Sequence, residues 1–387
     1  GQPVTFYSGV LTSIGGTLTK LGSGTLVVAK DNTYDGGTTI SAGGTLQLGS
    51  TSDSYHGFGN TGSLGTGAIV NNGTLSINRT NAYALTNAMS GAGSLTLANT
   101  GNITLSGNNS NFTGAININA GSLSIGSANA FGSGGMISFG GGTLQYAAGF
   151  TTDYSSRFNT ADGQAYKINT NSQDVTLASS LGGVGSSLSK SGAGSLTLSG
   201  NNTYSGATTL SAGTLKAGSS TAFGTGSITE SSNAVLDLNG QTMTSTGGLS
   251  LNGTGIGLNG ALINSSAIGA TYAGLVTLGS ATTITGGSGT IALTNTGTIT
   301  GAALGLTLDG ASGGSMASIL GTTTGTLTKA GTGTWSLSGA NTYTGATTVS
   351  NGTLVLSGAS TSTGAITISA GTLIVDGTGL LGGGAYA

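Results

Sequence analysis

The chain has 387 residues, of which 77 are glycine and none is cysteine, and with only 5% charged residues its formal net charge is −2. The absence of cysteine excludes disulfides and thiolate metal sites. Isolated Lys and Arg residues argue against nucleic-acid binding, and no apolar run approaches the roughly 18–20 residues that cross a bilayer. Because 36% of the residues are hydrophobic, the composition still predicts a folded protein.

The chain opens with a short apolar stretch and continues as alternating strands. Residues 1–17, which begin GQPVTFYSGV, are predicted to form an N-terminal strand that caps the fold or takes part in assembly. Further on, apolar residues occupy every second place in stretches such as GTLVVA, GAININA, SLTLSG and GAITISAGTLIV. This period of two, with Gly-rich turns between the stretches, predicts an all-β fold of short strands.

A longer repeat runs through residues 18–375. Four copies lie near residues 18–49, 95–126, 188–218 and 327–358. Each copy carries an aromatic residue followed two positions later by a glycine: Tyr34 and Gly36, Phe112 and Gly114, Tyr204 and Gly206, Tyr343 and Gly345. Three copies also share a lysine, at Lys20, Lys190 and Lys329. The shared positions predict one structural unit used several times.

Units of this kind cannot bury both of their faces alone, so they stack on one another. Short strands with Gly and Asn turns predict a single parallel β-helix, or β-solenoid, built from Gly-, Thr-, Ser- and Asn-rich repeats. At about 20–25 residues per coil, the chain is expected to form about 15–19 coils. Leu, Ile and Val would then stack inside, and Thr, Ser and Asn would face water.

One stretch, residues 150–174, is more irregular and holds an unusual share of the charged and aromatic residues. It is interpreted either as a longer loop packed on the solenoid or as a contact patch for a ligand. The patch residues would be Asp153, Tyr154, Arg157, Phe158, Tyr166 and Lys167. The chain finishes in a Gly-rich tail, residues 376–387.

Candidate chemical groups are few. His56 is the only histidine and stands in a Gly-rich segment typical of an exposed loop. Glu230 and Asp237 would suit sugar hydrolysis if their carboxyl groups were about 5–9 Å apart, but a satisfied surface pair is the simpler interpretation. Trp335 is read as a core filler or as a stacking platform for a sugar. No catalytic, cofactor-binding or metal-ligating residue is predicted.

Residues 327–356, LTKAGTGTWSLSGANTYTGATTVSNGTLVL, resemble the passenger-associated repeat of bacterial autotransporters. The resemblance extends over the four copies. It implies a right-handed parallel β-helix that is secreted or displayed on the surface of a Gram-negative-type bacterium, commonly for adhesion or presentation. It also implies that Tyr34, Tyr204, Tyr343 and the glycines that follow them are structural residues.

Two functions follow as expectations. The first is a non-enzymatic extracellular structural protein that stacks head-to-tail into a surface filament or matrix fibre, because neither end shows the polar cap that solenoids normally carry. The alternative is a monomeric autotransporter-type passenger that acts as an adhesin or binds surface glycans or other cells, with residues 150–174 as its contact patch. A third hypothesis, ice binding through Thr ladders, requires a more regular array.

Overall fold

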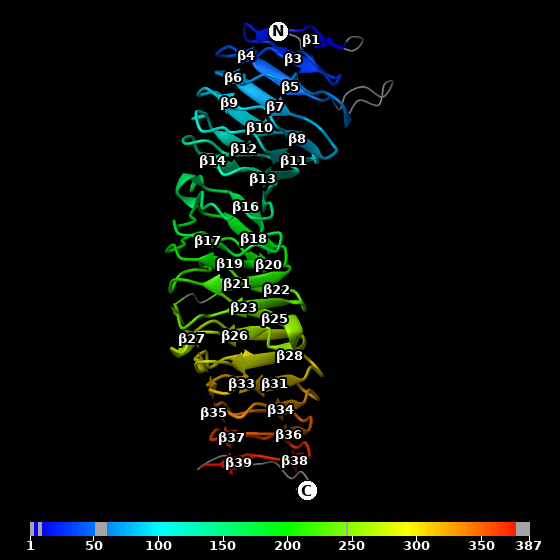
Figure 1. Ribbon diagram of the computed structural model, residues 1–387. Helices are drawn as coiled ribbons and strands as arrows, with labels where there is room; N and C mark the ends of the chain where they lie inside the picture. The colour runs from blue at the N-terminus through cyan, green and yellow to red at the C-terminus, as the bar shows by residue number, and fades with distance from the viewer. Residues whose placement is uncertain (1–3, 7–9, 51–59, 245–246, 377–387) are drawn as a thin grey trace. The chain divides into compact units, whose positions relative to one another are not determined.

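The computed structural model describes residues 4–6, 10–50, 60–244 and 247–376 of the chain. Among these residues, helix is confined to short 3-10 segments such as η2 (Ser155–Arg157) and η3 (Ile256–Leu258). The strands pair in parallel with those of the coils before and after, which gives a β-solenoid of about 17 turns (Figure 1). This confirms the all-β solenoid predicted from the alternation of apolar residues. The number of turns also lies within the predicted range of about 15–19 coils. Contacts divide the chain into two compact units, Gly1–Gln173 and Asp174–Ala387.

The first unit contains strands β1–β16, which form three columns of parallel strands. The first column is β1 (Val4–Phe6), β3 (Thr25–Val28), β5 (Thr45–Leu48), β7 (Thr74–Ile77), β10 (Ser94–Leu97), β12 (Ile116–Ile118) and β14 (Ile137–Phe139). The second is β2 (Leu18–Lys20), β4 (Thr38–Ile40), β6 (Ile69–Asn71) and β9 (Met89–Ser90). The third is β8 (Tyr83–Leu85), β11 (Asn102–Leu105), β13 (Ser122–Ile125), β15 (Thr143–Tyr146) and β16 (Ala165–Asn169).

The second unit follows the same plan with β17–β39. One column is β17 (Val175–Leu177), β19 (Ser195–Leu198), β21 (Gly213–Ala217), β23 (Ala234–Asp237) and β26 (Leu262–Asn264). Another is β18 (Ser187–Ser191), β20 (Thr208–Leu210), β22 (Ile228–Glu230), β25 (Leu249–Gly253), β28 (Val276–Gly286), β31 (Leu306–Asp309), β34 (Leu327–Lys329), β36 (Thr347–Val349) and β38 (Ile366–Ile368). A third is β24 (Thr242–Met243), β27 (Ala270–Tyr272), β29 (Ile291–Leu293), β32 (Gly313–Met316), β35 (Thr334–Leu337), β37 (Thr353–Leu356) and β39 (Thr372–Val375), and β30 (Thr298–Ile299) pairs with β33 (Ile319–Leu320). β28 also pairs with β26.

The core consists of like residues stacked on like residues. Leu46 lies between Leu26 and Leu75 in register, and Leu95 follows Leu75 on the next coil. Leu46, Leu75 and Leu95 are fully buried, and burial of each such side chain contributes about 1.5–3 kcal/mol. The strand period thus supplies a continuous apolar interior.

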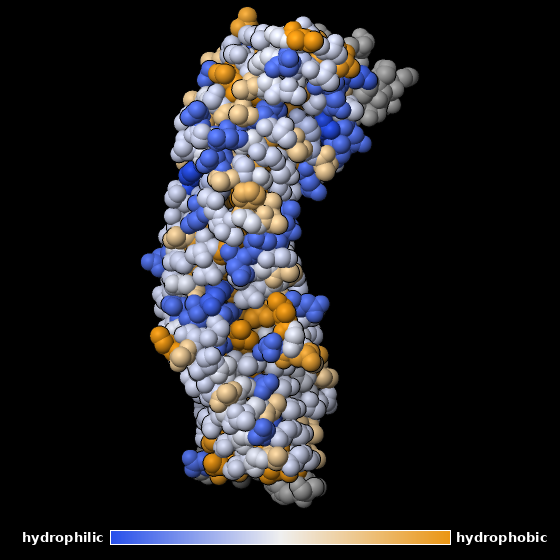
Figure 2. All heavy atoms as spheres, in the orientation of Figure 1, coloured by the Kyte–Doolittle hydropathy of each residue, from blue (hydrophilic) through white to orange (hydrophobic). Residues whose placement is uncertain are grey.

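The outer positions of the same strands carry hydroxyl and amide groups. Thr25, Thr45, Thr74 and Ser94 follow one another in register, and the hydroxyls of the last two lie 3.1 Å apart. Figure 2 shows the result on one face, where residues of intermediate hydropathy cover most of the surface and hydrophobic groups form only small separate patches. A surface of this kind needs few charged residues.

The asparagine that precedes the aromatic residue of each repeat bridges three successive coils. The Oδ1 atom of Asn202 accepts a hydrogen bond from the backbone N–H of Leu181, 2.7 Å away on the preceding coil. Its Nδ2 donates to the carbonyl of Ala222 on the following coil. Equivalent bridges, here called asparagine clamps, are made by Asn32, Asn109 and Asn341.

The aromatic residue and the glycine of the repeat fill fixed places beside this clamp. Tyr34, Phe112, Tyr204 and Tyr343 are all buried. The hydroxyl of Tyr204 lies 2.7 Å from that of Thr208, and the same pairing recurs in two other copies. A Cβ atom added at Gly36, Gly114, Gly206 or Gly345 would lie 1.5–2.5 Å from a backbone carbonyl oxygen of the preceding coil. The repeat therefore needs glycine at this place because the two backbones touch.

The lysine of the repeat donates hydrogen bonds from its buried side chain to the carbonyl groups of a turn. The Nζ atom of Lys190, which is fully buried, donates to the carbonyls of Ser191, Gly192 and Ala212 at 3.0, 2.7 and 3.0 Å. Lys20 and Lys329 bind turn carbonyls in the same way. Burial lowers the pKa of Lys190 to about 8, and Asp174 opposes that shift.

Residues at the two predicted end segments are only partly described. Val4–Phe6 form β1 and pair with β3, while residues 377–387 of the predicted Gly-rich tail lie outside the described part of the chain. No helix in the described part has the length and hydropathy required of a membrane-spanning helix.

Candidate functional site

The irregular stretch at 150–174 begins as a long excursion between β15 and β16 of the first unit. Its three aromatic patch residues, Tyr154, Phe158 and Tyr166, are only 6%, 5% and 0% exposed. The ring of Phe158 packs edge-on against Phe139 at 4.9 Å, and Tyr166 packs on the same ring at 5.4 Å. The prediction that these three rings form a contact surface is therefore corrected, because the excursion folds its aromatic side chains inward.

The polar members of the predicted patch stay nearer the surface. Asp153 is exposed and accepts a hydrogen bond from the backbone N–H of Ser155 at 2.7 Å, which holds the start of η2. Lys167 is half-buried, and its Nζ donates to the carbonyl of Gly141 at 2.8 Å. Both side chains thus have local structural contacts.

Arg157 is the patch residue with the most unusual surroundings. Its Nε donates to the carbonyl of Gly135 at 2.8 Å, and its Nη1 donates to the carbonyls of Phe131 and Gly132 at 3.0 and 3.1 Å. Its Nη2 is shielded from water and has no acceptor in the described structure. The guanidinium lies 5.8 Å from the centre of the Tyr154 ring. These contacts fix the guanidinium in one orientation.

A hollow of about 340 Å³ lies beside this guanidinium. It is lined by Gly135, Met136, Ser156, Arg157 and Phe158. The Met136 side chain is 53% exposed, and Phe158 presents an apolar wall. Burial lowers the pKa of Arg157, and no carboxylate of the described residues forms an ion pair with it. The hollow is thus bordered by a fixed cation without a counter-ion.

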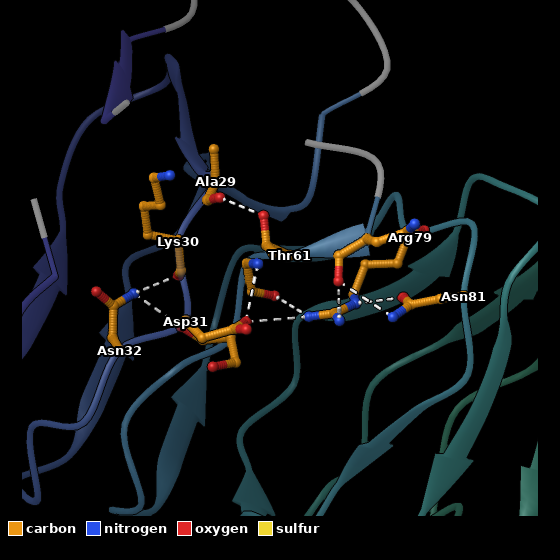
Figure 3. Close-up of polar contacts among 10 residues, drawn as sticks. Ala29, Lys30, Asp31, Asn32, Thr61, Arg79 and Asn81 are labelled. Atoms are coloured by element: carbon orange, nitrogen blue, oxygen red, sulfur yellow. Dashed lines mark hydrogen bonds and ion pairs between the residues drawn. The ribbon is translucent and has the colours of Figure 1, made fainter. Parts of the chain in front are cut away.

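A second arginine, which sequence reasoning missed, has a different role. The Nη1 of Arg79 donates to the carbonyl of Gly62 at 2.9 Å and to Asp31 Oδ1 at 3.3 Å, and its Nη2 donates to the carbonyl of Asn60 at 2.6 Å. Its Nε donates to Asn81 Oδ1 at 3.0 Å, so the side chain joins three coils (Figure 3). Arg79 is only 5% exposed, and each of its three side-chain nitrogen atoms has an acceptor. Arg79 therefore has a structural role.

His56, the histidine named from the sequence, lies outside the described residues.

The candidate carboxylate pair does not form an accessible site. Glu230 ends β22 and points into the core, where it is 1% exposed and both of its carboxyl oxygens lack partners. Asp237 lies on β23, in another strand column, and its oxygens accept from Ser265 Oγ at 2.6 Å and from the backbone of Asn239 at 2.9 Å. Lys216 Nζ approaches it at 3.6 Å. The two carboxyl groups therefore do not face a common solvent-filled space.

Glu230 makes the stability of the second unit depend on pH. Burial raises the pKa of its carboxyl from the usual 4.5 to about 9. The native state therefore keeps a proton that the unfolded chain releases, and stability falls as pH rises from about 4.5 towards 9. We expect Glu230→Gln to raise the free energy of unfolding at pH 7.5 by about 1–3 kcal/mol and to flatten its dependence on pH.

Urea unfolding at pH 5, 6, 7 and 7.5 checks this expectation. The range stops there because Lys190 begins to lose its proton near pH 8, and that loss changes stability in the opposite direction. Val184→Thr, at a position of the same unit that is 72% exposed, is the control and should retain the wild-type slope. An unchanged slope in Glu230→Gln would show that the carboxyl is already ionised in the native protein.

Trp335 belongs to the core. It is fully buried, and its Nε1 donates to the carbonyl of Asp309 at 3.0 Å. Of the two interpretations left open by the sequence, the core filler is the one observed. The ring is closed to a sugar.

Comparison with known proteins now identifies the repeat. The sequence model of the passenger-associated-transport-repeat matches residues 18–48, 95–125, 188–217, 327–356 and 351–375. These are the four copies read from the sequence and a fifth that contains β38 and β39. No solved structure matches the chain.

A curated relative adds a second line of support. The chain is 32% identical over 310 residues to the Adhesin BmaC autotransporter of Brucella suis biovar 1 (strain 1330), and the match covers 70% of this chain. It covers 9% of that protein, so the chain spans only a small part of the length of its relative. The repeats matched in both units and this similarity together support an autotransporter passenger-repeat protein.

Proposed function

We propose that the chain is part of a secreted or surface-displayed bacterial passenger that mediates adhesion without catalysis. The observation that carries the proposal is its 32% identity, over 310 residues, to an autotransporter adhesin. The fold supports it, because coils tied by asparagine clamps give a stiff support whose outer face presents hydroxyl and amide groups. Such groups form many weak hydrogen bonds with glycans and cell surfaces at little desolvation cost.

Bead attachment tests this proposal. Beads coated with the purified chain should bind cultured epithelial cells well above beads coated with albumin, and soluble chain should compete. Beads coated with heat-unfolded chain are the matched control. Attachment no stronger than the albumin background would contradict the proposed function.

End-to-end association, the first function expected from the sequence, is retained as a second candidate. Val349 and Leu356 are buried, whereas Ile368 and Val375 occupy the same register positions on the last described coil and are 45% and 40% exposed. These inner apolar positions suit pairing with a further coil, and a second copy has such coils. We propose that stacking of this kind builds a filament.

Sedimentation velocity over a range of concentrations tests the stacking proposal. Wild type should form concentration-dependent polymers, and Val375→Lys should remain monomeric. Val70→Lys, at a side position that is 40% exposed, is the matched control and should behave as wild type. A wild-type chain that is monomeric at the highest concentration would contradict the proposal.

A further inference from the structure

We propose that the hollow beside Arg157 binds one carboxylate-bearing sugar unit of an acidic glycan. The inference rests on the proposed adhesive function and names the ligand class and the place of contact. The site is formed by Arg157 and Ser156 from η2, and by Gly135 and Met136 from the turn that leads into β14. Phe158 completes its wall.

The charge of the ligand follows from the state of Arg157. Three of its hydrogen bonds go to neutral carbonyls, and its Nη2 has no acceptor. Nη2 is shielded, so a ligand in the hollow would be held by attraction to the charge of the guanidinium and not by a hydrogen bond to this atom. A partly buried charge without a counter-ion is costly, and a carboxylate in the hollow lowers that cost. Because no described carboxylate pairs with Arg157, a ligand carboxylate would supply the missing counter-ion.

The size and lining of the hollow indicate a single small unit. Ligand pockets range over about 300–1,000 Å³, and this hollow of about 340 Å³ lies at the lower end. Ser156 can exchange hydrogen bonds with ring hydroxyls, while the exposed Met136 side chain offers apolar surface to the C–H face of a sugar. Gly135 is required at the edge, because a Cβ atom there would lie 1.9 Å from the carbonyl oxygen of Gly114.

The backbone around the hollow is held in place before any ligand arrives. Arg157 ties η2 to the turn at residues 131–135 through its three carbonyl bonds. The Phe131 and Tyr154 rings pack at 4.9 Å beneath the same turn. A preformed site loses little conformational entropy on binding, which suits recognition of a small ligand.

The test introduces a charged side chain at the rim of the hollow. Arg157 is not substituted, because its hydrogen bonds also stabilise the fold. Met136 is 53% exposed, so Met136→Glu and Met136→Lys should both fold. Val184→Glu, at a residue of the other unit that is 72% exposed, is the control. The probes are trigalacturonic acid and 3′-sialyllactose, with the methyl ester of the first and plain lactose as neutral partners, measured by titration calorimetry and saturation-transfer NMR.

Wild type should bind at least one acidic probe and bind its neutral partner at least tenfold more weakly. Met136→Glu should weaken that binding at least tenfold by repulsion, Met136→Lys should keep or strengthen it, and Val184→Glu should leave it unchanged. Binding of trigalacturonate alone assigns a uronic acid, and binding of sialyllactose alone assigns a sialic acid.

The proposal is overturned if neither acidic probe binds, if the neutral partners bind equally well, or if Met136→Glu binds as wild type. Bead attachment is scored separately with the same variants. Binding of an acidic sugar without bead attachment would contradict the proposed adhesive function but support the proposed site. Bead attachment without binding of an acidic sugar would support the adhesive function but contradict the proposed site.

Discussion

Asn202→Ala is expected to lower the thermal midpoint of the second unit by about 10 °C. Asn202 is 2% exposed, and its amide satisfies the N–H of Leu181 and the carbonyl of Ala222 on two different coils. Alanine leaves both backbone groups buried and unpaired, at about 1–3 kcal/mol each. For a unit of this size, each kcal/mol lowers the midpoint by about 2–4 °C.

Circular dichroism melting and hydrogen exchange together check this expectation. Exchange should accelerate at Leu181, on the coil before the substitution, as well as at the substituted coil. Asn201→Ala is the matched control, because its side chain is exposed, and it should melt within about 2 °C of wild type. Equal thermal midpoints for Asn202→Ala and Asn201→Ala would show that the asparagine clamp contributes little to stability.

Gly114→Ala is expected to be still more damaging and to prevent stable folding of the coils around β12. An added Cβ atom would lie 1.5 Å from the carbonyl oxygen of Gly93 and 2.7 Å from the ring of Phe112. Neither the backbone nor the buried ring has room to move, so the two coils must separate. The loss should exceed about 4 kcal/mol, which only the severest single substitutions reach.

Gly24→Ala is the matched control for this substitution. Nothing lies within 4 Å of the Cβ position at Gly24, so alanine there should be neutral or stabilise by up to about 1 kcal/mol through the unfolded state. Limited proteolysis and the soluble yield of the two proteins give the comparison. Equal protease resistance would refute the close approach of the two coils.

The fold was predictable because the strand period is local information. Alternating apolar residues and glycine-rich turns can be read within a few positions, and the repeats show that units stack. Tyr34, Tyr204 and Tyr343 are buried, and the glycines that follow them lie against the backbone of the preceding coil, which shows why the repeat keeps its spacing.

The candidate site was predicted only in part, because it depends on contacts between coils. Charged and aromatic residues in one segment left two interpretations open, a loop packed on the solenoid or a contact patch. In the structure, Tyr154, Phe158 and Tyr166 turn inward onto rings contributed by earlier coils. Arg157 was named from the sequence as a member of the segment, but its carbonyl partners, which lie more than 20 residues away, could not be read there. Arg79 was missed for the same reason, since its partner Asp31 is 48 residues distant.

The asparagine clamps also have a consequence for how the chain could be assembled in time. A clamp is complete only when the coil on its far side has arrived, since one half of the amide bonds backwards and the other half bonds forwards. In a chain that emerges gradually from a narrow pore, each clamp would therefore close only after the next coil has emerged. Every coil fixed in this way would make it harder for the chain to move back into the pore. The repeat would then act as a ratchet, converting random thermal motion into movement in a single direction.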